Sequence, residues 1–172
     1  LSDLIDRSLE LIVQLRPALA ARPPDGAPRR LVVDLGCGDG RWLIAAAARF
    51  GWRGVGVDLN DALLARGRAA AARAGVEALV SFSRADLLRA DVRDADVVVA
   101  YLFREGVASV REKLGAELRP GAVVVSIGFE LKGGWVAAAS ERVGALPFYV
   151  YTGGARGGGP LTWGGYLARG VT

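Results

Sequence analysis

The stretch Val32–Arg41, VVDLGCGDGR, decides the fold of this 172-residue chain. A short apolar strand ends there, three glycines follow at alternate positions (Gly36, Gly38 and Gly40), and an Ala-rich helical segment begins. Glycines permit positive φ and let a ligand approach the backbone closely. At the carboxyl end of a parallel strand, such a loop lies where open α/β sheets bind ligands. A tight turn without a ligand is the alternative, but three glycines exceed what a turn needs.

Strands and helices alternate around this loop. Apolar runs predict strands at 31–35, 53–58, 79–84, 95–102 and 121–127. Helical spacing predicts helices at 3–16, 41–50, 60–74 and 105–118. Helices of this length between strands indicate parallel pairing, with right-handed crossovers that cover both faces of the sheet. Segments 136–143 and 147–152 are expected to close the sheet as an antiparallel pair, which gives an α/β, doubly wound, mostly parallel seven-stranded sheet.

The chain is long enough for one domain, which we expect to span residues 1–172. Residues 1–30 form an N-terminal helix, ended or kinked at Pro17, and a connector; residues 31–152 form the core fold. Residues 153–172 form a Gly-rich C-terminal extension, in which 161–168 is a candidate extra strand. A chain of this size buries about 70% of its unfolded surface, so its core requires neither a disulfide nor a structural metal.

The composition excludes several kinds of catalytic site. The chain has 52% hydrophobic and 23% charged residues, one cysteine (Cys37) and no histidine. A histidine base, a Ser–His or Cys–His pair and a histidine-ligated metal are therefore excluded. The single cysteine and the lack of a signal-peptide pattern predict a cytoplasmic protein, and no apolar run is long enough for a membrane segment. The net charge is +4, but the arginines are scattered, so there is no strong nucleic-acid signal.

Acidic residues indicate which ligand the loop binds. A dinucleotide fingerprint would place its third glycine at Arg41, whereas the spacing here is G-x-G-x-G. Asp34 precedes the loop and Asp39 lies inside it, and carboxylates there would repel a pyrophosphate. They suit a ligand with positive charge, such as S-adenosylmethionine, whose carboxylate can accept hydrogen bonds from the loop N–H groups.

Two further acids follow the next two strands. Asp58 ends the second strand, where an acid can accept hydrogen bonds from ribose hydroxyls. Asp86 follows the third strand and could accept from an adenine amino group, with Leu59 and Leu87 against the ring faces. Each acid alone is more simply explained as a helix cap or a solvated charge. Their joint placement at strand ends indicates one ligand that lies across all three.

On these residues the chain resembles the seven-β-strand, class I S-adenosylmethionine-dependent methyltransferases, over about residues 31–152. The resemblance implies a Rossmann-like fold, an enzyme that uses S-adenosylmethionine and releases S-adenosylhomocysteine, and no metal. It also implies which residues contact the cofactor: Asp34, Gly36, Gly38, Gly40, Asp58 and Asp86. We expect Cys37, Leu59 and Leu87 to contact it as well.

A closer similarity is to the small protein-lysine methyltransferases of archaeal and mitochondrial type. That group includes enzymes acting on the ATP synthase c subunit and on the adenine nucleotide translocase. The similarity is carried by the loop 34–41, by the turn Tyr101–Leu102–Phe103–Arg104 after the fourth strand, and by residues 114–131, LGAELRPGAVVVSIGFEL. Three features depart from the group: Arg104 stands where it has a proline, no aromatic-Pro segment precedes the first helix, and residues 153–172 have no counterpart.

Methyl transfer from a sulfonium depends mainly on positioning. A lysine acceptor has an ordinary pKa of about 10.4, and partial burial beside a positive charge favours its neutral form. No strong base is then required, in agreement with the absence of histidine. We expect Tyr101 to position the acceptor and to line its channel together with Phe103 and Trp135, with packing in the core as the alternative.

The function hypothesis is therefore a methyltransferase acting on a protein lysine. A small-molecule methyltransferase and a catalytically inactive cofactor-binding partner remain alternatives. An NAD-dependent oxidoreductase is disfavoured by Asp34, Asp39 and Arg41. A nucleic-acid amino group is disfavoured because no Asn/Asp-Pro-Pro-aromatic motif follows the fourth strand.

Overall fold

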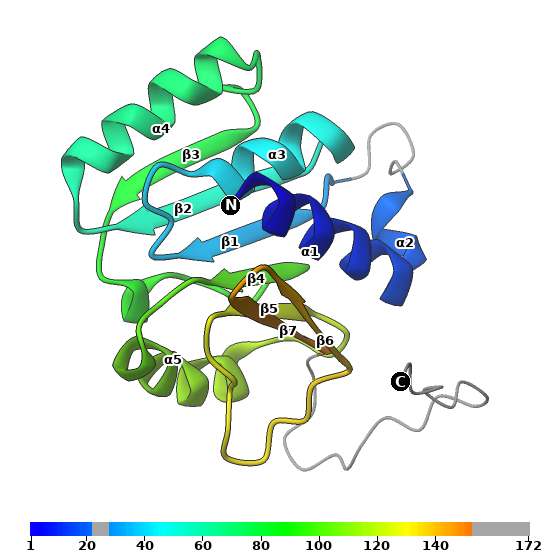
Figure 1. Cartoon of the computed structure of the whole chain (residues 1–172). Helices are drawn as coiled ribbons and strands as arrows, with labels where there is room; N and C mark the ends of the chain where they lie inside the picture. Colours follow the sequence, from blue (N-terminus) through cyan, green and yellow to red (C-terminus); the bar gives the residue numbers. More distant parts are fainter. Residues whose placement is uncertain (22–27, 153–172) are drawn as a thin grey trace.

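The computed structural model describes residues 1–21 and 28–152 and is built around a seven-stranded sheet (Figure 1). The strands are β1 (Leu31–Leu35), β2 (Arg53–Asp58), β3 (Val80–Arg84), β4 (Val97–Ala100), β5 (Val123–Ile127), β6 (Ala139–Val143) and β7 (Leu146–Thr152). The helices are α1 (Ser2–Leu15), α2 (Pro17–Ala20), α3 (Arg41–Phe50), α4 (Asp61–Arg73), the 3-10 turn η1 (Leu87–Arg89) and α5 (Arg104–Glu117).

The strand order is β3-β2-β1-β4-β5-β7-β6. Strands β1 to β5 pair in parallel, whereas β7 pairs antiparallel with both β5 and β6. This confirms the predicted α/β fold and its antiparallel closing pair. Strand β1 has β2 on one side and β4 on the other, so the chain order reverses at β1, and ligands bind at such a point in open sheets.

Local signals set most element boundaries. The Asn60 side chain caps α4 by accepting hydrogen bonds from the N–H groups of Ala62 and Leu63. Pro17 separates α1 from α2, as expected of a residue that cannot continue a helix. The predicted strand 136–143 begins later, at Ala139, because a turn through two positive-φ glycines at 133 and 134 precedes it. The candidate strand 161–168 lies outside the described residues.

The helices cover both faces of the sheet, as Figure 1 shows. Helices α1, α3 and α4 pack on one face through residues such as Leu9, Leu43 and Leu64, and α5 packs on the other through Val110 and Leu114. Strands β4 and β5 are buried along their whole length. Each such buried aliphatic side chain contributes about 1.5–3 kcal/mol relative to exposure.

Polar contacts join α1 to α3 and to β6. The Ser8 hydroxyl accepts a hydrogen bond from Trp42 Nε1 of α3 at 3.0 Å. Arg7 binds Glu141 of β6 with two hydrogen bonds, Nε to Oε2 at 2.6 Å and Nη2 to Oε1 at 2.8 Å. The first turn of α1 is thereby held against the carboxyl ends of the central strands. Within residues 1–21 and 28–152, no helix is both long and apolar enough to cross a membrane.

Candidate active site

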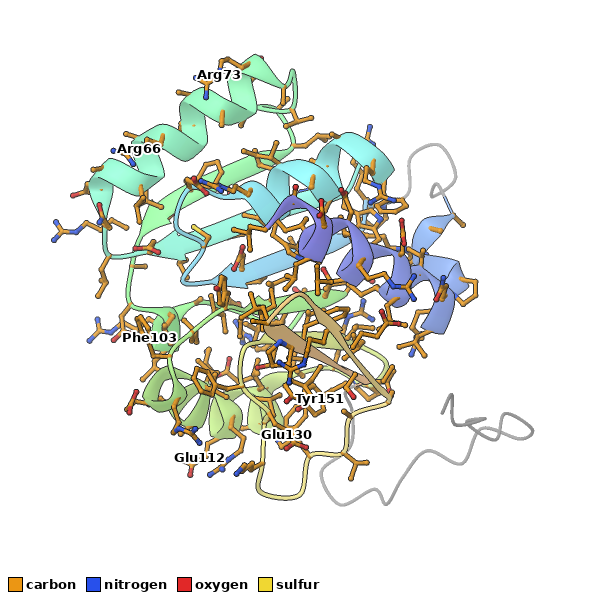
Figure 2. The ribbon with its side chains drawn as sticks, in the orientation of Figure 1. Arg66, Arg73, Phe103, Glu112, Glu130 and Tyr151 are labelled. Atoms are coloured by element: carbon orange, nitrogen blue, oxygen red, sulfur yellow. The ribbon has the colours of Figure 1, made fainter. Side chains whose placement is uncertain are left out.

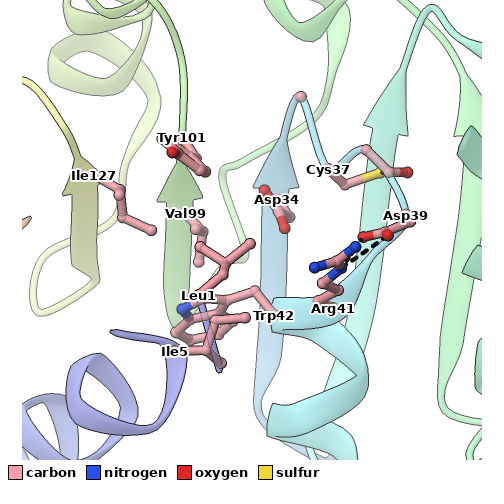
Figure 3. Close-up of a pocket in the computed structure, with 12 residues that line it drawn as sticks. Leu1, Ile5, Asp34, Cys37, Asp39, Arg41, Trp42, Val99, Tyr101 and Ile127 are labelled. Atoms are coloured by element: carbon pink, nitrogen blue, oxygen red, sulfur yellow. Dashed lines mark hydrogen bonds and ion pairs between the residues drawn. The ribbon is translucent and has the colours of Figure 1, made fainter. Parts of the chain in front are cut away.

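A pocket with a cavity volume of about 160 Å³ lies at the carboxyl ends of β1 and β4. Figure 3 shows Asp34 in its centre, with Tyr101, Val99 and Ile127 on one side and the glycine loop on the other. The first turn of α1 closes the pocket with apolar side chains. The pocket therefore has one polar part, made by the loop and its acids, and one apolar wall, made by Leu1, Ile5, Trp42, Val99 and Ile127.

The glycine loop adopts the conformation that its sequence predicts. Gly36, Gly38 and Gly40 have φ values of +80°, +54° and +70°. A Cβ on Gly40 would overlap the Phe82 ring, and one on Gly36 would lie 2.7 Å from Leu102. At Gly38 the nearest side-chain atom would be 3.9 Å away. Packing thus explains two of the glycines, and Gly38 leaves room for a ligand to approach the backbone.

Most N–H groups of the loop already have acceptors inside the protein. Those of Gly36 and Cys37 donate to the Val57 carbonyl, and that of Gly40 donates to the Cys37 carbonyl. The N–H of Gly38 donates to Asp58. The expectation that a ligand carboxylate binds the loop N–H groups is therefore restricted to the ones that remain, at Asp39 and in the first turn of α3.

Asp34 is a buried acid that faces the pocket. Its side chain is only 4% exposed and has no hydrogen-bond partner among the described residues. Burial first, and the neighbouring charge of Asp58 second, raise the pKa of Asp34 to about 7. A cation placed in the pocket would favour the ionised carboxylate.

Asp58 connects the loop to the next strand. One carboxylate oxygen accepts from the Gly38 N–H and the other from the Asn60 N–H, both at 2.9 Å. A carboxylate has about four lone-pair sites, so both oxygens can still accept from hydroxyl groups. The predicted role with a ribose is compatible with this geometry and stays a prediction.

Asp86 caps η1, because its carboxylate accepts from the Leu88 N–H at 2.9 Å. Leu59 and Leu87, the two residues predicted to contact the adenine ring, differ in their exposure. Leu59 is 66% exposed beside the site, whereas Leu87 is half-buried against the core on the α5 face. The capped turn directs Leu87 inward and leaves Leu88 exposed. The predicted ring contact of Leu87 stays a prediction, and the exposed Leu88 is a second candidate for it.

Cys37 fills the space beneath the loop. A Cβ on Gly56 would lie 2.6 Å from the Cys37 sulfur, so a larger residue at Gly56 has no room. Burial, aided by the nearby acids Asp34 and Asp58, raises the pKa of the Cys37 thiol far above its ordinary value. The thiol is therefore neutral and lines the pocket as a small apolar group.

The three residues predicted to line the acceptor channel lie in different places. Tyr101 lines the pocket. Phe103 caps α5, is 85% exposed and stands outside the pocket lining. Trp135 does not reach the site: it packs edge-on against Tyr151 with ring centroids 5.8 Å apart, on the α5 face of the sheet. This geometry favours the packing alternative, and the acceptor role of Trp135 stays a prediction.

Other charged groups complete the site. Asp39 pairs with Arg41 at 2.8 Å, so its charge is partly compensated.

Sequence reasoning missed Leu1, Ile5 and Ile127, since helical spacing shows that α1 buries a face but not which strand ends that face meets. In the part of the chain that the structure describes, no three His, Cys, Asp or Glu side chains lie close enough together to hold a metal ion.

Comparison with known sequences identifies the family that the chain matches. Residues 34–138 match the family described as the ANTKMT methyltransferase domain. A protein-lysine N-methyltransferase of Saccharolobus islandicus is 38% identical over 104 residues, which cover 60% of this chain and 65% of that protein. The adenine nucleotide translocase lysine N-methyltransferase of Mus musculus is 41% identical over 107 residues, which cover 62% of this chain and 46% of that protein. The chain thus spans less than two thirds of either relative.

Comparison with solved structures finds the same fold. An RNA methyltransferase from Salinibacter ruber, in complex with S-adenosyl-L-homocysteine, superposes with a TM-score of 0.74 and 34% identity. The match covers 87% of this chain and 90% of that one. A SAM-dependent methyltransferase from Geobacter sulfurreducens, also bound to S-adenosyl-L-homocysteine, gives a TM-score of 0.55 and 27% identity, over 69% of this chain and 47% of that one.

Proposed function

Because the chain belongs to the family of the ANTKMT methyltransferase domain, we propose that it transfers a methyl group from S-adenosylmethionine to a lysine side chain of a protein. One observation carries the proposal: the family match, residues 34–138, contains the glycine loop, Asp58 and Asp86, and the structure gathers these at the carboxyl edge of one sheet. The names of the archaeal and mouse relatives support lysine as the acceptor.

The residues at the carboxyl ends of β1, β2 and β3 fit S-adenosylmethionine, which supplies an activated methyl group on a positively charged sulfur; Asp34 lines the pocket, and Asp58, Leu59 and Leu88 lie outside its lining. Asp34 offers a buried carboxylate without a partner among the described residues, which suits a cation. Asp58 retains lone pairs for ribose hydroxyls. Leu59 and Leu88 are exposed apolar side chains that suit the faces of a planar ring.

The apolar wall supplies the conditions for the acceptor. Val99, Ile127 and Tyr101 surround the end of β4, where an amine would enter. Removal of an amine from water lowers its pKa and favours the neutral nucleophile. Alignment of the reacting groups can account for ~7–11 kcal/mol of the barrier. The chain contains no histidine, so the proposed mechanism relies on desolvation and on the position of Tyr101 rather than on a histidine base.

RNA is the second candidate acceptor. The observation that favours it is the similarity to the RNA methyltransferase from Salinibacter ruber, which covers most of both chains. The small-molecule acceptor and the inactive partner stay as alternatives without a specific observation of their own.

We also propose a cytoplasmic location, which rests on the single cysteine of the sequence.

The experiment that tests the proposal is transfer of tritium from labelled S-adenosylmethionine into a cell lysate, followed by separation of protein, RNA and small molecules. Label in protein, recovered as methyl-lysine after acid hydrolysis, is the expected result. Label in RNA would move the assignment to the second candidate, and label in small molecules alone would refute the lysine assignment. Absence of transfer to any fraction, with S-adenosylmethionine still bound, would indicate the inactive partner.

A further inference from the structure

The exposed large apolar side chains of this protein gather at one edge. Among the described residues there are six: Leu1, Leu59, Leu88, Tyr101, Phe103 and Val136. Leu59, Leu88, Tyr101 and Phe103 follow the carboxyl ends of β2, β3 and β4, and Leu1 lines the pocket. Only Val136 lies elsewhere, in the loop before β6. Clustered exposed apolar groups indicate a binding surface, whereas scattered ones are ordinary.

Phe103 is the most exposed member of this set, at 85%. Figure 2 shows it at the N-terminal end of α5, on the outside of the ribbon. It makes no ring stacking or cation–π contact among the described residues, unlike the neighbouring Arg104, which lies over the Phe129 ring. Burial of such a side chain is favourable, so Phe103 offers a partner a substantial apolar contact.

The turn that carries Phe103 is fixed to the glycine loop. Leu102 packs so closely on Gly36 and Gly106 that an added Cβ would lie 2.7 Å and 3.1 Å from its side chain. The residue before Leu102 lines the pocket and the residue after it points outward. Tyr101 and Phe103 therefore hold set positions relative to the loop, one inside the pocket and one beside it.

The charges around the pocket favour a cationic acceptor. Four segments border the strand ends: 34–41, 58–61, 84–89 and 101–105. They contain six Asp or Glu residues and four Arg residues, whereas the whole chain has 18 acidic and 22 basic residues. These four segments together thus hold more acidic than basic residues, the reverse of the whole chain. Phosphate backbones bind basic surfaces, so this edge suits a lysine-bearing protein better than RNA.

We infer that Phe103 is a docking anchor for a protein acceptor: an apolar residue next to the target lysine packs on Phe103 while the lysine side chain enters beside Tyr101. The inference rests on the proposed function and goes beyond it, because it states what the acceptor must carry around its lysine. In the proposed site the cofactor contacts Leu59 and Leu88, which leaves Phe103 free for the acceptor. A small acceptor confined to the pocket would not reach Phe103.

The test uses two synthetic peptides, one with a lysine between glycines and one with a lysine flanked on both sides by leucine and phenylalanine. The intact protein should methylate the apolar-flanked peptide with a kcat/KM about ten-fold higher, which corresponds to ~1.4 kcal/mol. Phe103→Ala should reduce this preference to near one. Phe103→Leu, which keeps an apolar contact without an aromatic ring, should keep most of it. Val136→Ala is the matched control and should leave the preference unchanged, because Val136 is exposed but lies in the loop before β6 and outside the pocket lining.

A binding measurement distinguishes failure of Phe103 as a docking anchor from failure of the proposed methyltransferase function. The fluorescein-labelled peptides and a single-stranded RNA oligonucleotide are titrated against protein saturated with S-adenosylhomocysteine. Tighter binding of the apolar-flanked peptide that is lost in Phe103→Ala supports the anchor even if no peptide is methylated. A peptide preference that survives Phe103→Ala overturns it. RNA binding that both Phe103→Ala and Phe103→Leu weaken, without an effect on peptides, also overturns it and indicates base stacking.

Discussion

The Asp58 carboxylate accepts a hydrogen bond from the Gly38 N–H at 2.9 Å, across the gap between β2 and the glycine loop. The acid that sequence analysis assigned to the ligand is thus also a part of the loop architecture. Its second oxygen binds the Asn60 N–H and orders the turn into α4. The loop and the predicted ribose contact are therefore one unit, and a change at Asp58 acts on both.

Asp58→Ala should weaken the binding of S-adenosylhomocysteine by ~1.5–3 kcal/mol, the cost of removing a charged hydrogen-bond partner. Isothermal titration calorimetry measures this as a rise in Kd of about 10- to 150-fold. Asp61→Ala is the control, since that exposed acid pairs with Arg84 at 3.5 Å and with no other side chain in residues 1–21 and 28–152. An unchanged Kd for Asp58→Ala would remove Asp58 from the cofactor site.

Gly40→Ala should destabilise the protein more than Gly75→Ala. Both glycines have positive φ, +70° and +68°, so both substitutions introduce strain of ~1–2 kcal/mol. Only at Gly40 does the new Cβ also meet a side chain, Phe82, while nothing lies within 4 Å at Gly75. Overpacking of this kind adds ~1–3 kcal/mol. Urea unfolding of the two variants measures the difference, and equal midpoints would show that Phe82 moves aside without cost.

Local signals predicted the strands, the glycine loop and its acids, because hydrophobic alternation and glycine spacing depend on neighbours in the chain. They did not place β7 between β5 and β6, which depends on pairing between distant segments. Local signals also did not show that Leu87 and Trp135 pack on the α5 face of the sheet. Their direction is set by a capped turn and by packing on Tyr151, not by the strand that precedes each of them.

Trp135→Ala should reduce stability without affecting the acceptor. The ring packs edge-on against Tyr151 on the face away from the pocket, so its loss should cost about 3 kcal/mol of unfolding free energy. The KM for a lysine peptide should stay within about two-fold of the wild-type value, whereas Tyr101→Ala should raise it well beyond that. An equal rise in both variants would return Trp135 to the acceptor channel.

Asp34 should make stability depend on pH. Its pKa is raised from 3.8 in the unfolded chain to about 7 in the folded protein, by burial and by Asp58. Between these values the folded state holds a proton that the unfolded chain releases, so stability falls as pH rises through this range. The slope from this one residue is at most about 1.4 kcal/mol per pH unit. Asp34→Asn should therefore raise Tm by several degrees at pH 8 and leave it unchanged near pH 4.

The same acid should couple cofactor binding to proton release. A cation in the pocket stabilises the ionised Asp34, so S-adenosylmethionine should bind more tightly as pH rises from 5 to 7 and should displace a proton at pH 6. Calorimetry at pH 6 in two buffers with different ionisation enthalpies measures that proton directly. Asp34→Asn should bind more weakly at pH 7, with an affinity that no longer changes over this range. A variant that is more stable at pH 8 but keeps the wild-type pH dependence of binding would show that Asp34 is a buried acid without a role in cofactor recognition.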